Sequence, residues 1–182
     1  MYTEKISNID FILDVNIKVK NINLAFEIYQ SKSLEDNSNL DNSNLNKLEI
    51  YNIEMKYIEF IDKCFDLNNK KGIIVDFYMD RLDEEALEKM KSFLDINEIV
   101  ILEAFLEENN YAGTYFKVLK KEILTLFIKL SVREIFFISF YMLDYEVTLW
   151  GNYNRKFPIF YKEEKLILLY ENIANENNLL VK

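Results

Sequence analysis

The sequence predicts an α+β fold, and three observations lead to this prediction. Half of the 182 residues are hydrophobic, which is enough apolar surface for a buried core. Apolar residues alternate over 9–28, as they do in strands, whereas those of 83–95 and 162–177 recur at helical spacing. We therefore expect a mixed, mostly antiparallel sheet packed by about three amphipathic helices, in a single domain spanning 1–182.

The N-terminal segment 9–28 is expected to form a β-hairpin. Apolar residues occupy odd positions in 9–19 and even positions in 22–28. A two-residue turn at 20–21 accounts for this change of phase, because it places both apolar sets on the same face of the strand pair. Asn, the second residue of that turn, tolerates the positive φ that such turns require.

A polar stretch and an ambiguous stretch follow. Residues 31–46 are rich in Asn, Asp and Ser, and the pentapeptide DNSNL occurs twice, at 36–40 and 41–45. These side chains bond to the local backbone in competition with a sheet, so we expect a surface loop. A calcium loop is disfavoured because the stretch lacks the Gly that forms its sharp turn.

Residues 47–66 fit a bulged strand or a helix, and we favour a strand that leads into a helix.

The middle of the chain is expected to hold a strand, a helix and a further apolar segment. Gly72 precedes the apolar run 73–79, and Asp83 is suited to cap a helix over 83–95. The apolar run 98–106 would complete a βαβ unit as a strand, but it also fits a helix.

The C-terminal third is expected to combine two helices with an antiparallel hairpin. Apolar residues of 112–130 repeat on one helical face, and so do those of 162–177. Between them, the apolar runs 134–142 and 145–150 flank a turn, which predicts a hairpin over 134–150.

The composition excludes several kinds of chemistry. The chain has no His and a single Cys, Cys64, so Cys–His zinc sites, Ser–His or Cys–His catalytic pairs and an intramolecular disulfide are excluded. Its three Gly residues lie far apart, so no P-loop or GxGxxG motif is present. We therefore expect no catalytic residue, no metal and no cofactor. The carboxylate pairs that an enzyme could still use are Asp76 with Asp80 and Glu103 with Glu107.

Charge and hydropathy also limit the partners. No apolar run approaches the roughly 18 residues of a transmembrane helix, and the N-terminus lacks the apolar core of a signal peptide. The net charge of −9 repels nucleic acid and anionic lipid, so neither is expected as a partner. A cytoplasmic location is the default expectation for a chain that cannot form a disulfide.

The negative charge is concentrated in one segment. Residues 76–108 contain 11 acidic and three basic residues. Clustered carboxylates are suited to binding Lys and Arg side chains of a partner, although they also serve solubility. The expected partner-binding residues, which we call the acidic face, are Asp80, Asp83, Glu84, Glu85 and Glu88.

A second candidate contact surface consists of Trp150, Tyr153 and Arg155, at a predicted turn. Trp, Tyr and Arg are enriched among the residues that dominate binding energy at interfaces. Core packing is the alternative for the neighbouring aromatic residues.

Together these features predict a non-catalytic protein-binding domain. We expect a bacterial immunity or antitoxin type of protein that neutralises a basic toxin or nuclease through its acidic face. The alternative is a small-molecule-binding or regulatory module, and a second alternative is a carboxylate-dependent enzyme. A homo-oligomer built on an exposed strand edge is compatible with all three.

Overall fold

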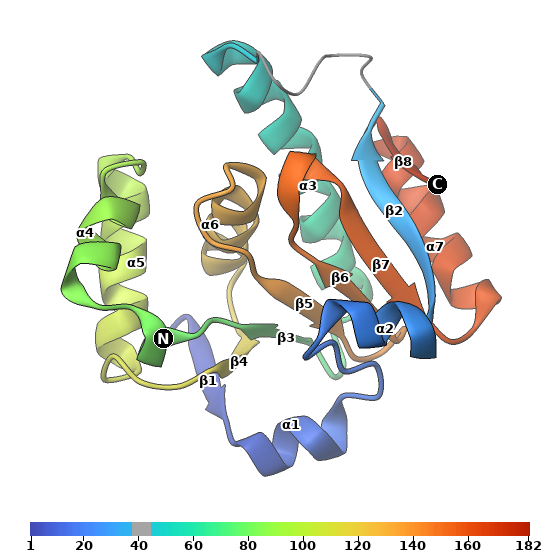
Figure 1. The fold of residues 1–182 in the computed structure, drawn as a ribbon, viewed down its shortest axis with the longest axis horizontal. Helices are drawn as coiled ribbons and strands as arrows, with labels where there is room; N and C mark the ends of the chain where they lie inside the picture. The colour runs from blue at the N-terminus through green and yellow to red at the C-terminus, as the bar shows by residue number, and fades with distance from the viewer. Residues whose placement is uncertain (38–44) are drawn as a thin grey trace.

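The computed structural model describes residues 1–37 and 45–182 and shows an α+β protein built on one sheet (Figure 1). The described residues form eight strands in the order β1-β4-β3-β5-β6-β7-β2-β8, and every pairing is antiparallel. The expected fold class is therefore confirmed, although the sheet is not mixed. The strands are β1 (Thr3–Ile6), β2 (Gln30–Asp36), β3 (Ile73–Asp76), β4 (Tyr115–Val118), β5 (Ser139–Met142), β6 (Val147–Trp150), β7 (Phe157–Tyr161) and β8 (Leu179–Val181).

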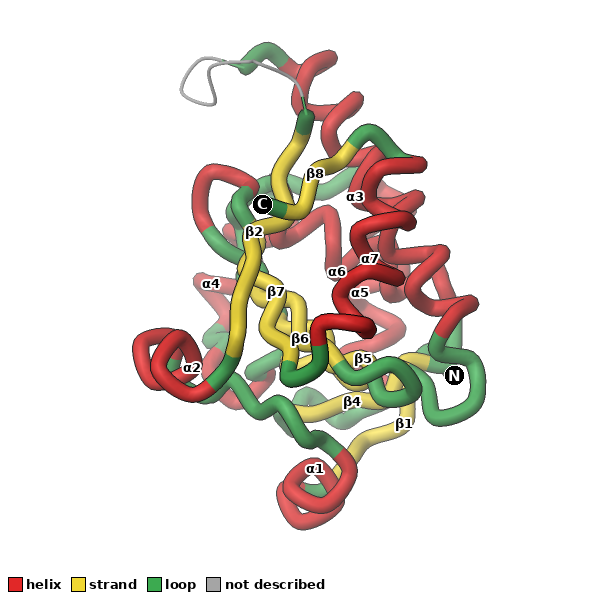
Figure 2. The backbone as a smooth tube through the Cα atoms, turned by 90° about the vertical axis from the view of Figure 1, so that its right-hand side faces the viewer, coloured by secondary structure: helices red, strands yellow, loops and turns green. Residues whose placement is uncertain are grey.

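Helices cover both faces of this sheet. In the described ranges they are α1 (Asn8–Asp14), α2 (Ile22–Ile28), α3 (Lys47–Leu67), α4 (Glu84–Lys91), α5 (Ile96–Glu108), α6 (Lys121–Val132) and α7 (Glu164–Glu176), with 3-10 turns η1 (Met79–Arg81) and η2 (Tyr153–Arg155). The main core lies between the sheet and α3, α5, α6 and α7. Two smaller apolar clusters lie on the opposite face, under α1 and α2, and Figure 2 shows these two short helices apart from the larger group. No helix of the described residues is both long and apolar enough to cross a bilayer.

The prediction of a hairpin over 9–28 is wrong, because a polar cap starts a helix in each of the two expected strands. Ser7 accepts a hydrogen bond from the Asp10 amide (3.1 Å), and Asn21 accepts from the Leu24 amide (3.2 Å), so the expected turn residue instead caps α2. Residues 15–20 form neither a helix nor a strand, and there the alternation does bury Val15, Ile17 and Val19 against the sheet. The Thr148 hydroxyl donates to the Ile17 carbonyl (2.6 Å), so side chains satisfy backbone that no strand pairs.

Removing the cap of α2 is expected to destabilise the protein. Asn21→Ala deletes the acceptor for two amides of the first helical turn, which costs about 1 kcal/mol at such positions. Asn23→Ala is the control, since Asn23 is an exposed residue of the same turn whose side chain caps nothing. Urea unfolding measures both variants, and equal stability of the two would contradict the capping role of Asn21.

The loop expected over 31–46 is partly wrong. Residues 31–36 belong to β2, an inner strand that pairs with β7 on one side and with β8 on the other. Pairing on both sides supplies the ladder hydrogen bonds that override the weak strand propensity of these polar residues. Most of the DNSNL repeat, at 38–44, lies outside the described residues.

Two ambiguous segments are helical because of capping boxes. In α3, Asn46 accepts from the Glu49 amide (3.1 Å) while Glu49 accepts from the Asn46 amide (2.7 Å), so the strand favoured for the start of 47–66 is wrong. Asp95 and Glu98 form the same reciprocal pair at the start of α5. The run 98–106 is thus a helix, and no βαβ unit forms in this part of the chain.

The remaining elements match the predictions to different degrees. Asp83 caps α4 as expected, through the Ala86 amide (2.8 Å), but this helix ends at Lys91 rather than at residue 95. The helix expected over 112–130 is wrong in its first half, which forms β4 and pairs with β1 and β3 on its two sides. The helix over 162–177 and the hairpin within 134–150 are confirmed, as α7 and as β5 with β6.

Candidate functional site

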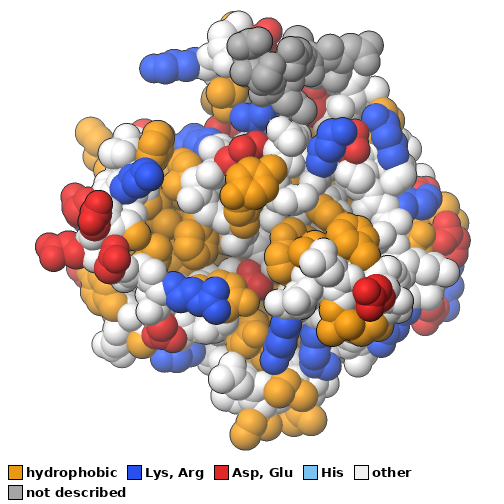
Figure 3. All heavy atoms as spheres, in the orientation of Figure 1, with side chains coloured by type: hydrophobic (Ala, Val, Ile, Leu, Met, Phe, Trp, Pro, Cys, Tyr) orange, Lys and Arg blue, Asp and Glu red, His pale blue; other side chains and the backbone are white. Residues whose placement is uncertain are grey.

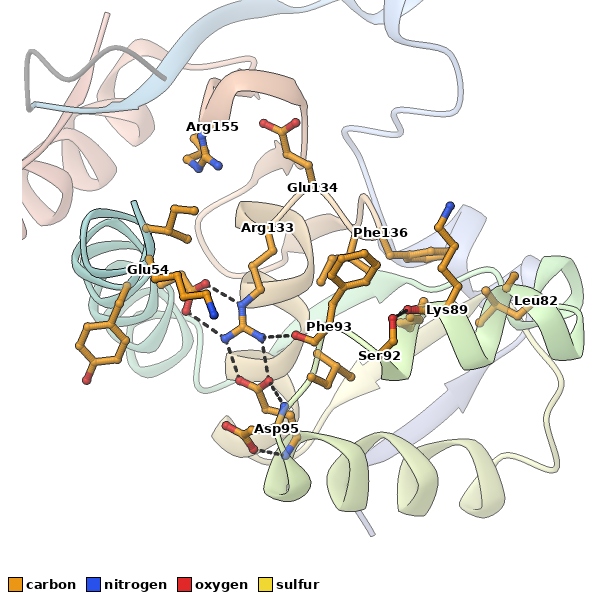
Figure 4. A pocket seen from close by; sticks show the side chains of 18 of the residues that line it. Glu54, Leu82, Lys89, Ser92, Phe93, Asp95, Arg133, Glu134, Phe136 and Arg155 are labelled. Carbon is orange, nitrogen blue, oxygen red and sulfur yellow. Dashed lines mark hydrogen bonds and ion pairs between the residues drawn. The ribbon is translucent and has the colours of Figure 1, made fainter. Parts of the chain in front are cut away.

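A cleft of about 1080 Å³ opens between α3, α4, the start of α5, the end of α6 and η2. Figure 3 shows this face, where hydrophobic side chains surround a hollow and Lys or Arg side chains lie along it. The close view places Phe93 and Phe136 at its centre, Leu82 and Lys89 on the α4 side, and Arg155 toward η2 (Figure 4).

An ionic network built on Arg133 forms the floor of the cleft. Its Nε and Nη2 donate to Glu54 (2.6 and 3.1 Å), and its Nη1 and Nη2 donate to Glu98 (2.7 and 2.9 Å). The Nη1 group also donates to the Phe93 carbonyl (3.3 Å). All five guanidinium N–H groups therefore have protein acceptors, and Arg133 is a structural residue of the cleft rather than a free cation.

Glu98 is the second centre of this network. It also accepts a hydrogen bond from Lys129 Nζ (2.8 Å) and caps its own helix through the Asp95 amide. Burial acts to raise the pKa of Glu98, but the hydrogen bonds from Arg133 and Lys129 outweigh it and hold this pKa at about 2. The network thus joins α3, α5 and the end of α6 through Glu54, Glu98 and Arg133.

Four other cations line the cleft: Lys47, Arg81, Lys89 and Arg155. None of them forms an ion pair with a residue in the described ranges. Arg81 lies over the ring of Tyr78, 4.4 Å from its centroid. The cleft therefore presents uncompensated positive charge although the chain as a whole is acidic.

Arg155 has an unusual backbone and an unpartnered side-chain atom. Asn154 and Arg155 both have positive φ, 57° and 54°, which is uncommon for residues other than Gly. The Arg155 carbonyl accepts a hydrogen bond from buried Tyr57 (2.5 Å), which helps to fix this conformation. Its Nε is buried and has no hydrogen-bond partner among the described residues.

The acidic face is only partly available to a partner. Asp83 caps α4, Asp80 accepts from the Gly113 amide (3.3 Å), and Glu88 pairs with Lys91 (3.1 Å). Glu84 and Glu85 are exposed and have no ionic or hydrogen-bonding partner in the described structure. Figure 3 shows acidic side chains gathered at the edge of the molecule where α4 and α5 lie.

Exposed apolar side chains lie on α5 and in the connection between α4 and α5. Phe93 is 57% exposed, Ile96 81% and Val100 58%. Lys91, which bridges Glu88 and Glu103 (3.1 Å to each), holds α4 against α5. Apolar residues beside unpaired charge are typical of protein-binding surfaces.

The structure does not bring Trp150, Tyr153 and Arg155 into one contact surface. Trp150 is half-buried against the apolar cluster under α2. Tyr153 is exposed and packs its edge against Phe137, with ring centroids 4.5 Å apart. Only Arg155 lines the cleft.

In each candidate carboxylate pair, one carboxylate already interacts with other residues of the chain. Asp76 is buried in the sheet, where it accepts from the Ser139 amide (2.6 Å) and the Tyr141 hydroxyl (3.1 Å). Burial raises the pKa of Asp76 to about 6, although these hydrogen bonds act to lower it. Asp80 is exposed, Glu103 pairs with Lys91, and no group of three or more potential ligands gathers at a metal site in the described residues.

Cys64 is fully buried in the main core. This burial raises the pKa of its thiol well above the usual value, which disfavours the reactive thiolate. The thiol therefore behaves as a small apolar core group.

Comparison with known protein families, curated proteins and solved structures finds no significant match for this chain. Evidence for function therefore comes from the geometry of the cleft and of a second region, which we call the α4–α5 surface: the exposed residues of α4, of α5 and of the connection between them. The cleft could not be predicted from the sequence, because the four cations that line it without an ion pair in the described structure come from positions 47, 81, 89 and 155 and share no motif.

Proposed function

We propose that this protein is a non-catalytic, cytoplasmic binding protein of the immunity or antitoxin type, which binds a basic protein through the α4–α5 surface. The observation that supports this proposal is that Glu84 and Glu85 at the start of α4 are exposed and have no partner in the described structure, while Phe93 and Ile96, between the end of α4 and the start of α5, expose apolar side chains. A charged surface attracts a partner of opposite sign and speeds its encounter, while apolar contacts slow its dissociation.

Most of the remaining carboxylates of residues 76–108 contribute less to such a surface. Asp76 and Glu98 are buried, Glu103 is bridged to Lys91, and Glu108 pairs with the N-terminal amine (3.2 Å). Glu107 on α5 is exposed and has no partner in the described structure, so the charge that a partner meets is carried by Glu84 and Glu85 on α4 together with Glu107 on α5. Among acidic proteins, this concentration on two consecutive helices is the feature that points to recognition rather than to solubility alone.

Charge reversal on α4 tests this proposal. Partners are sought by co-expression with the tagged products of the genes that flank its own. Glu84→Lys, Glu85→Lys and Glu88→Lys combined are expected to weaken the complex about 100-fold or more, because attraction to Lys and Arg of the partner becomes repulsion. Calorimetric titration measures the dissociation constant, and higher salt is expected to weaken the wild-type complex.

A matched triple variant controls for net charge. Asp14→Lys, Glu27→Lys and Glu59→Lys change the charge by the same amount at exposed positions on α1, α2 and α3. This control is expected to retain most of the affinity. Equal affinities of the two triple variants for the partner would refute recognition through α4.

The cleft favours a second candidate function, that of a small-molecule-binding module. Its volume of about 1080 Å³ is sufficient for a drug-sized ligand, and apolar walls with a few polar groups are typical of ligand sites. On α4 the two proposals use different residues, since Lys89 and Met90 line the cleft while Glu84 and Glu85 do not, but Phe93, which follows α4, borders both sites.

A further inference from the structure

We propose that the cleft binds an organic anion, a carboxylate or phosphate carried on an aromatic or apolar body, and that Arg155 contacts the anionic group. This inference deepens the second candidate function, on which it rests. It does not depend on the carboxylates of the α4–α5 surface, because none of Glu84, Glu85 and Glu88 lines the cleft, although Phe93 borders both sites.

The charges within the cleft select an anion. Its carboxylates already have partners: Glu54 and Glu98 bind Arg133, Asp95 caps α5, and Glu134 accepts from the Asn154 amide (2.8 Å). Lys47, Arg81, Lys89 and Arg155 form no ion pair with any residue of the ranges 1–37 and 45–182. A bound anion would supply the missing negative charge, whereas a bound cation would meet only carboxylates that are already occupied.

Arg155 is the cation best placed to contact the anion directly. Arg133 has no N–H group left to donate, and Lys47, Arg81 and Lys89 are exposed at the rim. Arg155 is half-buried, and its buried Nε atom, which has no acceptor among the described residues, carries a desolvation cost that an anionic oxygen would remove. Its positive φ is a strained conformation of the kind that clusters at ligand sites.

The walls of the cleft select an apolar or aromatic body for this anion. Tyr51, Phe93 and Phe136 line it together with Leu82 and Leu94. In Figure 4 the Phe93 and Phe136 side chains lie between Arg155 and the α4 side, where a ring could pack against them. Inorganic phosphate alone would leave this apolar surface uncovered.

Three naphthalene probes test the inference, because they share a ring and differ in charge. We expect 1-naphthyl phosphate and 1-naphthoate to bind the wild-type protein in calorimetric titration and to raise its melting temperature. Neutral 1-naphthol is expected to bind at least about tenfold more weakly, since it lacks the charge-assisted hydrogen bonds. The two anions also distinguish a phosphate preference from a carboxylate preference.

Variants of two adjacent residues locate the anionic group. Arg155→Met is expected to weaken both anions about tenfold without changing 1-naphthol. Lys156→Met is the matched control, because it removes one positive charge from the next residue, which is exposed and does not line the cleft. Should Arg155→Met fail to fold, Lys89→Met on α4 tests the contribution of a second cleft cation, and we expect a smaller loss of anion affinity.

The outcomes separate the inference from the function on which it rests. Anion-selective binding that depends on Arg155 supports both. Equal binding of all three probes, unaffected by Arg155→Met and Lys89→Met, overturns the anion assignment and leaves a ligand-binding cleft. Absence of binding by all three probes up to about 1 mM overturns both the inference and the second candidate function.

Discussion

Arg133→Met is expected to destabilise the protein by about 3–5 kcal/mol, the largest effect of any single substitution considered for the cleft. The variant leaves Glu54 and Glu98 buried without the guanidinium that binds both of them. Breaking a buried ion pair costs more than the pair contributes, because an uncompensated charge remains. Urea unfolding at pH 7, followed by far-UV circular dichroism, measures the loss.

A triple variant distinguishes this cause from a loss of packing. Glu54→Gln and Glu98→Gln combined with Arg133→Met remove both stranded charges together with the cation, so most of the lost stability is expected to return. Arg81→Met is the control, since it removes an exposed Arg that lines the same cleft. A loss below about 1 kcal/mol for Arg133→Met alone would contradict the structural role of the network.

Asp76→Asn is expected to change how stability depends on pH. The folded state raises the pKa of Asp76 from 3.8 to about 6, so between these values the folded protein binds the proton more tightly than the unfolded chain does. Stability of the wild type therefore falls as pH rises through this window. Asn remains neutral and can still accept from the Ser139 amide, so the variant is expected to gain about 2–3 kcal/mol relative to wild type between pH 4 and pH 7.

Chemical unfolding at pH 4, 5, 6 and 7 measures this relative gain. Asp14→Asn serves as the exposed-carboxylate control on α1. A constant difference between Asp76→Asn and wild type across the four pH values would show that Asp76 does not titrate in this window. Asp76 is buried and its carboxylate accepts hydrogen bonds from Ser139 and Tyr141, which indicates a structural rather than a metal-binding role.

Sequence signals with a local physical cause predicted the structure best. Asp83 capped its helix as expected, and the apolar stripe of 162–177 formed α7. The capping box of Asp95 and Glu98 was an equally local signal, and it would have identified α5 as a helix. Apolar content alone could not, because an uninterrupted apolar run fits a buried strand and a buried helix alike.

Other errors arose from contacts between distant segments. Alternation over 9–28 reports burial only in 15–19, where a segment that is neither helix nor strand packs on the sheet. The residues of β2 have the composition of a loop, yet they pair with β7 and β8, which lie more than 100 positions later in the chain. Such pairings depend on tertiary context and leave no local pattern.

The candidate site was predictable only in part. The acidic composition of α4 was evident, but its availability depended on which carboxylates the chain uses for its own caps and ion pairs. The cleft depends on Arg133 being saturated by Glu54 and Glu98, which are distant from it in the sequence. Sequence spacing could not distinguish Arg133, whose N–H groups all have acceptors, from Arg155, which forms no ion pair in the described structure.

The central proposal is recognition of a basic protein through the α4–α5 surface, and hydrogen–deuterium exchange of the isolated and the complexed chain tests it most directly. Binding is expected to slow amide exchange over residues 84–103, while α7 and β8, at the other end of the sheet, keep their rates. Slower exchange confined to α1 and α2, with 84–103 unchanged, would contradict the proposal.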